Sequence, residues 1–126
     1  MRAREKKMTG EAGEKIASIY LKRIGYRILE SNFRTPFGEI DIVARLGRII
    51  VFVEVKSRTT SSFGPPYLSV TKIKQVHIIK NALFYLKRRR ITNAYWRIDI
   101  VSVKLTYDRK LEAIELIENA VEDNNT

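Results

Sequence analysis

The sequence predicts an α/β protein in which a central mixed β-sheet is flanked by helices. Two segments, residues 9–24 and 71–89, repeat apolar side chains at helical spacing. Between and after them lie segments of strand length that are rich in β-branched and aromatic residues. Helix, three strands, helix and strand therefore follow one another, and an extra strand is expected near the C-terminus. This order is typical of a sheet sandwiched between helices.

The first helix is expected to begin at Thr9, a favourable N-cap residue, and to stop at Gly25. Its apolar residues fall into two neighbouring stripes, Ala12, Ile16, Ile19 and Tyr20 in one and Ala17, Leu21 and Ile24 in the other. Residues 1–8 are expected to form a flexible basic arm, and residues 119–126 a flexible polar tail. Residues 9–118 then make a single domain.

Three strands are expected next, at residues 26–34, 38–45 and 49–56. A Thr-Pro-Phe-Gly turn at residues 35–38 joins the first two, and residues 46–48 join the second to the third. Such a short connection favours an antiparallel hairpin. Residues 49–56 are nearly all apolar and β-prone, which indicates a central strand covered on both faces.

The second half of the chain is expected to begin with a loop at residues 58–67, rich in Ser, Thr, Gly and Pro. The helix at 71–89 is expected to turn five apolar residues toward the core, Ile73, Val76, Ile79, Leu83 and Leu86. Strands at 95–103 and 111–117 complete the sheet, the latter at its outer edge. Asp99 is a lone acid among apolar residues, and we expect it to bond Arg97 or a loop amide.

The composition restricts the class of protein. With 126 residues, 44% of them hydrophobic and 30% charged, the chain is long enough for one folded domain with its own core. It has no cysteine, which excludes disulfides and cysteine-ligated metal sites. It shows neither a secretory signal nor an apolar run of membrane-spanning length, so we expect a cytoplasmic protein without a membrane partner.

A strong positive charge predicts an anionic partner. The chain holds 24 Lys and Arg against 14 Asp and Glu, a net charge of +10. Residues 55–98 contain ten basic residues and no acidic one, whereas five acids and one Lys follow residue 109. Nucleic acid is the commonest polyanion in the cytosol, and a basic protein that binds none is the alternative.

Two acids and a lysine are expected to meet on neighbouring strands. Alternation along a strand puts Glu39 and Asp41 on one face, with Ile40 and Ile42 on the other. In the next strand Glu54 and Lys56 share a face opposite to Val53 and Val55. If the two strands pair as a hairpin, Asp41 comes level with the Glu54 end.

Such a group has the chemistry of a hard-cation site. Burying a carboxylate is costly unless a cation compensates it. Two carboxylates, Asp41 and Glu54, with the backbone carbonyl of Val55 between Glu54 and Lys56, offer the oxygen ligands that Mg²⁺ prefers, and Mn²⁺ is the second candidate. The alternative is a cross-strand salt bridge between Lys56 and the two acids, a common arrangement that contributes little at a surface.

The motif Gly38-Glu39-Ile40-Asp41 followed by Val53-Glu54-Val55-Lys56, with Gly10-Glu11-Ala12-Gly13-Glu14 upstream, resembles the YraN family of small bacterial proteins. That family is similar to the PD-(D/E)xK nuclease superfamily and to archaeal Holliday-junction resolvases. The resemblance covers about residues 10–103 and implies a restriction-endonuclease-like fold. Ile40 stands where the motif has proline, a departure that the superfamily tolerates because the proline does no chemistry.

The resemblance implies roles for individual residues. Asp41 and Glu54 would be catalytic metal carboxylates, with the Val55 carbonyl as a further ligand. Lys56 would be the catalytic lysine, and Glu14 an acid that reaches the metal from the first helix. Helical spacing supports Glu14 only in part, because a glutamate bordering a buried stripe is also an ordinary boundary residue. For Glu39 a structural or exposed role is favoured over one next to the metal.

Seven residues are candidates for binding nucleic acid: Arg58, Lys72, Gln75, Lys87, Arg88, Arg89 and Arg90. Arg58 directly follows the motif, and related nucleases supply a Lys or Gln from a helix placed like that of Lys72 and Gln75. These two residues are equally well explained as ordinary exposed helix positions. The four basic residues at the end of the helix also complement its dipole.

Together these observations predict a Mg²⁺- or Mn²⁺-dependent endonuclease-like protein that hydrolyses DNA phosphodiesters, and the resemblance suggests branched structures as substrates. Two symmetric cuts in a branched DNA would require a homodimer. The rival prediction is a nucleic-acid-binding module that keeps the nuclease-like fold without cleaving. A third is a basic structural partner in a larger assembly. Recognition through the DNA backbone or its shape is expected in either of the first two cases.

Overall fold

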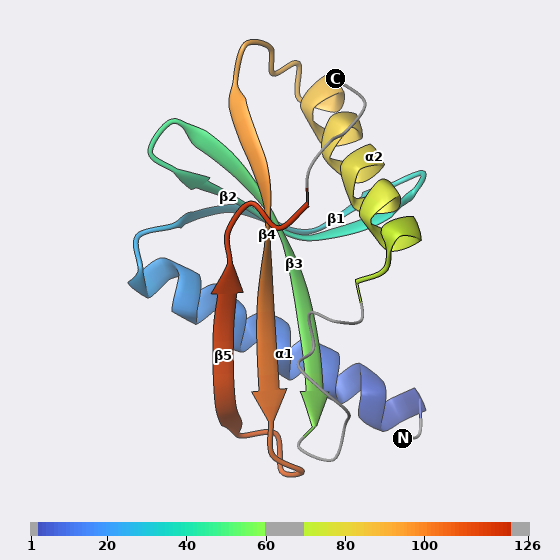
Figure 1. The fold of residues 1–126 in the computed structure, drawn as a ribbon, viewed down its shortest axis with the longest axis vertical. Coiled ribbons are helices and arrows are strands. Elements are labelled where there is room, and N and C mark those ends of the chain that lie inside the picture. Colours follow the sequence, from blue (N-terminus) through green and yellow to red (C-terminus); the bar gives the residue numbers. More distant parts are fainter. Residues whose placement is uncertain (1–2, 60–69, 122–126) are drawn as a thin grey trace.

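A five-stranded mixed sheet with one helix against each face forms the protein (Figure 1). The computed structural model describes residues 3–59 and 70–121. The elements are α1 (Ala3–Arg23), β1 (Arg27–Thr35), β2 (Gly38–Leu46), β3 (Ile49–Thr59), α2 (Lys72–Arg88), β4 (Tyr95–Leu105) and β5 (Leu111–Ile117). The strands lie side by side in chain order, with β3 and β4 parallel and the other pairs antiparallel. This confirms the predicted α/β fold, the β2–β3 hairpin and the outer position of the last strand.

Two apolar clusters, one on each face of the sheet, form the core. The cluster under α1 includes Leu21 with Val51, Val53 and Val101, all fully or nearly fully buried. The cluster under α2 is built around Phe52, whose ring meets those of Tyr85 and Trp96 edge-on. Because alternate residues of β3 enter the two clusters, β3 is the central strand that its apolar sequence predicted.

α1 begins earlier than its apolar pattern indicated. It starts at Ala3, so Thr9 lies inside the helix and is buried, and the prediction of Thr9 as N-cap was wrong. Residues 4–8 are mostly good helix formers whose side chains are exposed, so no apolar period marked them. At the other end the packed chain continues past residue 118: Ala120 donates its amide to the Ile98 carbonyl and Val121 is buried. Residues 1–2 and 122–126 of the expected arm and tail lie outside the described residues.

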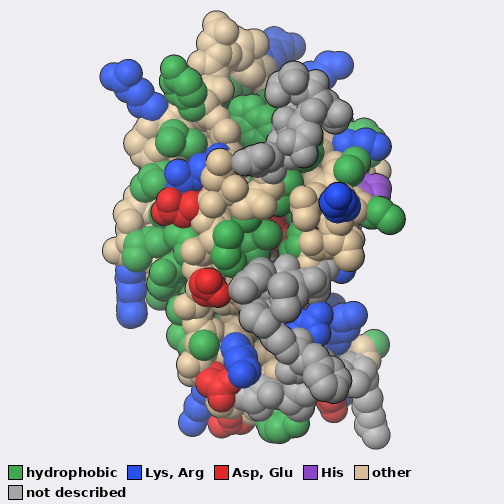
Figure 2. Space-filling model, in the orientation of Figure 1, with side chains coloured by type: hydrophobic (Ala, Val, Ile, Leu, Met, Phe, Trp, Pro, Cys, Tyr) green, Lys and Arg blue, Asp and Glu red, His purple; other side chains and the backbone are tan. Residues whose placement is uncertain are grey.

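The face that α2 turns to the sheet overlaps only partly with the one predicted: Ile79 and Leu86 pack against the cluster under α2, as expected. Its buried residues are Asn81, Ala82 and Tyr85, whereas three members of the predicted core face, Ile73, Val76 and Leu83, are 73%, 49% and 46% exposed. Figure 2 shows hydrophobic side chains beside the only histidine on the outer surface of this helix. The apolar pattern did not predict this face, because two of the three buried residues of α2 carry polar groups. Asn81 is hydrogen-bonded to Thr35, and Tyr85 is hydrogen-bonded to Glu30.

The expected loop at residues 58–67 is shorter at its start, because Arg58 and Thr59 continue β3. Residues 60–69 lie outside the described residues. Thr71 caps α2, its hydroxyl accepting a hydrogen bond from the Lys74 amide, as expected from a helix start at residue 71. Neither helix among the described residues combines the length and the apolar character needed to cross a bilayer.

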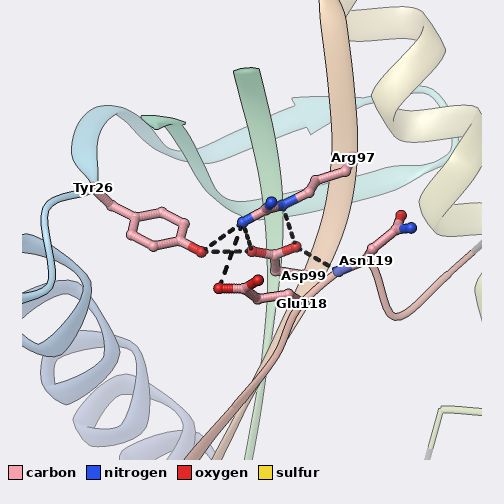
Figure 3. A network of polar contacts seen from close by, with 5 residues as sticks. All are labelled: Tyr26, Arg97, Asp99, Glu118 and Asn119. Atoms are coloured by element: carbon pink, nitrogen blue, oxygen red, sulfur yellow. Dashed lines mark hydrogen bonds and ion pairs between the residues drawn. The ribbon is translucent and has the colours of Figure 1, made fainter. Parts of the chain in front are cut away.

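A buried polar network ties the start of β1 to β4 and to the chain after β5 (Figure 3). Asp99 is fully buried and accepts hydrogen bonds from the Tyr26 hydroxyl at 2.9 Å, from Arg97 at 3.0 Å and from the Asn119 amide at 2.9 Å. Both expected partners of Asp99, Arg97 and a loop amide, are therefore present. Burial and the neighbouring Asp99 raise the pKa of Tyr26 to about 12, so the phenol remains a neutral donor.

Tyr26→Phe is expected to lower the free energy of unfolding by about 1–2 kcal/mol, because Asp99 loses one donor in a site without water access. Urea unfolding followed by circular dichroism measures this change. Tyr107→Phe is the matched control, since Tyr107 is 70% exposed and should change stability little. Equal stabilities of the two variants would show that the Tyr26 hydroxyl contributes nothing.

Candidate functional site

β2 and β3 separate at the point where the acidic residues lie. Their ladder ends with Ile42 opposite Val53. Beyond this pair the side chain of Asp41, in place of the β2 backbone, bonds to β3: its Oδ2 accepts a hydrogen bond from the Val55 amide at 2.8 Å. Because the N–H and C=O of one strand residue point to the same side, the Val55 carbonyl also faces this gap. The structure thus brings Asp41 to the end of the strand that carries Glu54, as expected.

Strict alternation along β2 fails at this point. Ile42 is paired with Val53, and both side chains belong to the cluster under α1. Ile40, two residues earlier in β2, belongs instead to the cluster under α2. The prediction that Ile40 and Ile42 share a face was therefore wrong. The neighbouring strand explains the break, because Asn32 of β1 lies between the pairs Ser31–Ile42 and Phe33–Ile40 and has a left-handed φ of 53°.

Glu54 and Lys56 form the second part of the site. They project from the same face of β3, and the Lys56 Nζ lies 3.1 Å from the Glu54 Oε1. Their side chains are only 18% and 23% exposed, so the pair is screened from water far more than a surface salt bridge. Lys56 therefore neutralises Glu54, and among the described residues the Asp41 carboxyl is left without a cation of its own.

Burial and mutual repulsion change the protonation of the two carboxyls. Burial first, and then the charge of Glu54, raise the pKa of Asp41 to about 8, although the Val55 amide opposes this. Burial also raises the pKa of Glu54, against the effect of Lys56 and of a hydrogen bond with the Asp41 carboxyl. At neutral pH the pair therefore retains a proton, which a bound cation would displace.

α1 adds Glu14 to this group, and β2 adds Glu39. Single carboxylate oxygens of Glu14, Glu39 and Asp41 lie within 4.8 Å of one another. Asp41 thus belongs to two sets, one with Glu54 and Lys56 and one with Glu14 and Glu39. Glu39 is exposed, as the favoured prediction had it, although its carboxylate lies near those of Glu14 and Asp41.

Glu14, Asp41, Glu54 and Lys56 line one cleft of about 610 Å³, and Glu39 is not part of its lining. Its lining residues are Lys6, Thr9, Gly10, Glu14, Asp41, Glu54, Val55, Lys56, Ser57, Arg58 and Lys74. All four residues expected to be catalytic are therefore brought together, with cations from α1, β3 and α2 around them. Buried carboxylate and carbonyl oxygens that converge at one point of an accessible cleft fit a hard divalent cation.

Among the expected nucleic-acid contacts, the structure places only Arg58 in this lining. Gln75 donates its side-chain amide to the Val70 carbonyl, and Lys72 is exposed beside the cleft residue Lys74. Lys74 and Lys6 were not predicted from the sequence. On the second helix Lys72 and Gln75 were predicted instead, by analogy with related nucleases, and Lys6 was expected to lie in a flexible arm.

The basic run at the end of α2 lies away from the cleft. Thirteen residues separate Lys74 from Lys87, which is about 20 Å along a helix. Within the run Arg89 is engaged by the protein itself: its Nε donates to Glu30 at 3.1 Å and its guanidinium stacks over Phe33. Lys87, Arg88 and Arg90 are exposed.

Gly13 lets α1 approach the sheet closely enough for Glu14 to reach the site. A Cβ on Gly13 would lie 1.7 Å from the Ser57 Oγ and 2.8 Å from the Ser57 Cβ. Gly13→Ala is therefore expected to lower the free energy of unfolding by about 1–3 kcal/mol, despite the better helix propensity of alanine. Thermal or urea unfolding measures it.

Two variants test the cause of this loss. Gly10→Ala lies in the same helix where an added Cβ meets nothing within 4 Å, and it should not destabilise. Ser57→Gly removes both clashing atoms and should restore stability in the Gly13→Ala background. If Gly13→Ala is as stable as Gly10→Ala, the close approach is not required.

Comparison with known proteins identifies the family of this chain. Residues 13–103 match the model of the Uncharacterised protein family UPF0102. A UPF0102 protein of Geobacter metallireducens is 50% identical over 116 residues, which cover 92% of this chain and 93% of the relative. Relatives from Syntrophus aciditrophicus (51% identity, 90% and 88% covered) and Caldicellulosiruptor saccharolyticus (41%, 91% and 98%) carry the same name. Matches of this length and identity show that the chain belongs to the UPF0102 family.

Proposed function

We propose that this protein is a metal-dependent endonuclease of the PD-(D/E)xK kind that hydrolyses DNA phosphodiesters. One observation carries the proposal: Asp41, Glu54, Lys56 and Glu14, from two strands and a helix, line a single cleft that is surrounded by cations. The element order agrees with the restriction-endonuclease-like fold that the motif implies. The lack of cysteine is compatible with the cytoplasm, where we place the activity.

The protein's oxygen atoms would hold Mg²⁺ or Mn²⁺. Asp41, Glu54 and Glu14 supply carboxylates, and the Val55 carbonyl faces the same gap. A cation bound here supplies a water of lowered pKa and neutralises charge on the phosphate. Lys56, held by Glu54 at 3.1 Å, places a positive charge where the phosphate becomes more negative during attack by water. The P–O bond to the leaving oxygen then breaks, and that oxygen takes up a proton.

The cations around the cleft would bind the DNA backbone. Lys6, Arg58 and Lys74 come from three different elements and line the cleft. The exposed Arg88 and Arg90 lie about 20 Å further along α2, which corresponds to about six base pairs of duplex at 3.4 Å each. One duplex along α2 can therefore contact both ends of the helix, without any base-reading element.

A second candidate function is a nucleic-acid-binding module that does not cleave. The direct Lys56–Glu54 pair favours it, because this contact neutralises one carboxylate without a metal. The two candidates differ in metal binding and turnover. A substrate set of duplex, single-stranded and four-way-junction DNA, with Mg²⁺, Mn²⁺ or EDTA, distinguishes them, and sedimentation of the junction complex tests the proposed homodimer.

Metal affinity is expected to rise with pH, by about tenfold per unit up to pH 8, because Asp41 must lose its proton to bind. Titration calorimetry with Mn²⁺ from pH 6 to pH 8.5 measures this. The stability of the metal-free protein is expected to change with pH in the opposite direction. Because the folded state keeps a proton on Asp41 that the unfolded chain has lost, the free energy of unfolding falls as pH rises from about 4 to about 8. No Mn²⁺ binding at any pH would reject the metal site and leave the binding module.

A further inference from the structure

Asn32 occupies a special position in the sheet. It lies in β1 directly across from Asp41, between the pairs Ser31–Ile42 and Phe33–Ile40. Its backbone is left-handed, with a φ of 53°, a conformation that asparagine tolerates better than other residues with a Cβ. The consequence is a local break in the alternation of β1, which turns the Asn32 side chain toward α1.

The side chain of Asn32 joins two carboxylates from different elements. Its Nδ2 donates to the Glu14 Oε2 of α1 at 3.1 Å and to the Glu39 Oε1 of β2 at 2.7 Å. The same two carboxylates stand with that of Asp41 in a group whose oxygens lie within 4.8 Å. Like charges at this distance repel, so Glu14 would turn toward solvent unless a donor held it. Both amide hydrogens of Asn32 are used for this purpose.

We propose that Asn32 is a positioning residue for the metal site, which holds the Glu14 carboxylate toward Asp41 through its side-chain amide. This inference rests on the proposed function. Asn32 itself supplies no charge and does not contact Glu54 or Lys56 in the described contacts. Its effect passes through Glu14, the carboxylate of the site that belongs to a helix. Among the described residues Glu14 accepts a hydrogen bond from Asn32, whereas Asp41 is fixed by the backbone amide of Val55.

Partners that orient metal ligands typically change metal affinity by 10–100-fold when they are removed. Asn32→Gly removes the amide and keeps the left-handed backbone, which glycine adopts without strain, so folding is preserved. Asn93→Gly is the matched control, because Asn93 also has a positive φ, 57°, and lies in the connection between α2 and β4. A role limited to the backbone predicts the same result for both variants.

The test is Mn²⁺ titration calorimetry at pH 8.5 on the full chain, with thermal unfolding in EDTA as a second readout. Asn32→Gly is expected to weaken Mn²⁺ binding by 10–100-fold at an unchanged unfolding midpoint, whereas Asn93→Gly matches the wild type. In a Glu14→Gln background Asn32→Gly should cause little further loss, since the two residues act through one contact.

Three results would overturn the inference. The first is an Asn32→Gly variant that binds Mn²⁺ as tightly as the wild type, which would leave the proposed function intact. The second is full additivity of the losses in Mn²⁺ affinity caused by Asn32→Gly and Glu14→Gln, which would show that the Asn32 amide does not act through Glu14. A wild-type protein without Mn²⁺ affinity removes the proposed function and this inference with it.

Discussion

Lys56→Ala is expected to slow DNA cleavage by about 10²–10³-fold while Mn²⁺ still binds at pH 8.5. Both carboxylates remain in this variant, so the metal ligands are intact, but the positive charge beside the reacting phosphate is gone. The measurement must be made at high pH, because Lys56 lowers the pKa of Glu54 and its loss strengthens proton competition at neutral pH. Single-turnover cleavage and Mn²⁺ calorimetry on the same preparation separate the two effects.

Glu54→Gln is expected to lose both properties. The side chain keeps its shape but no longer carries the charge that holds a cation, so Mn²⁺ binding and cleavage fall together. Lys104→Ala is the control for loss of a lysine, because Lys104 pairs with Glu112 at 3.4 Å in a contact about 40% exposed on both sides. It should leave both measurements unchanged.

The two variants also decide between the candidate functions. A salt-bridge lysine predicts that Lys56→Ala has no effect on a chemical step. If wild type and variants leave every substrate intact with either metal, the non-cleaving binding module is the better description. Cleavage that survives in Glu54→Gln would indicate a contaminating nuclease or a different site.

DNA affinity is expected to fall by about 10³-fold between 50 and 200 mM salt, given about six phosphate contacts. The physical cause is the release of counterions from the DNA when cations of the protein replace them. Fluorescence anisotropy with a short duplex at a series of salt concentrations measures the slope. An affinity that does not change with salt would exclude nucleic acid as the partner.

Charge reversals locate the contacts. Lys6→Glu with Lys74→Glu removes two cations from the cleft, and each lost phosphate contact should flatten the slope by about 0.9. Arg88→Glu with Arg90→Glu tests the far end of α2; Arg89 is left unchanged because it binds Glu30. Lys22→Glu with Arg23→Glu changes the net charge equally at the last turn of α1, about 25 Å along the helix from Lys6. This control should lower affinity least, and an equal loss in all three pairs would indicate attraction by net charge alone.

The sequence by itself determined the order of the elements, the central strand and the meeting of Asp41 with Glu54 and Lys56. These depend on local rules: an apolar run in β3, alternation that puts Glu54 and Lys56 on one face, and a short connection that fixes the hairpin register. The start of α1 and the buried face of α2 escaped the same rules, since exposed helix formers leave no apolar period and Asn81 is buried for its hydrogen bond.

Only the tertiary structure decided how α1 reaches the site and which cations surround it. Glu14 meets Asp41 because Gly13 packs against Ser57, and Glu39 is linked to Glu14 by the side-chain amide of Asn32. Lys6 of α1 and Lys74 of α2 line one cleft together with residues 54–58 of β3. These arrangements bring together residues that are far apart in the chain. Periodicity could not predict them, because it describes which face of a single helix or strand is buried and not which other element that face meets. The reason is physical: close packing between elements, not local propensity, selects which of many surface charges face one another.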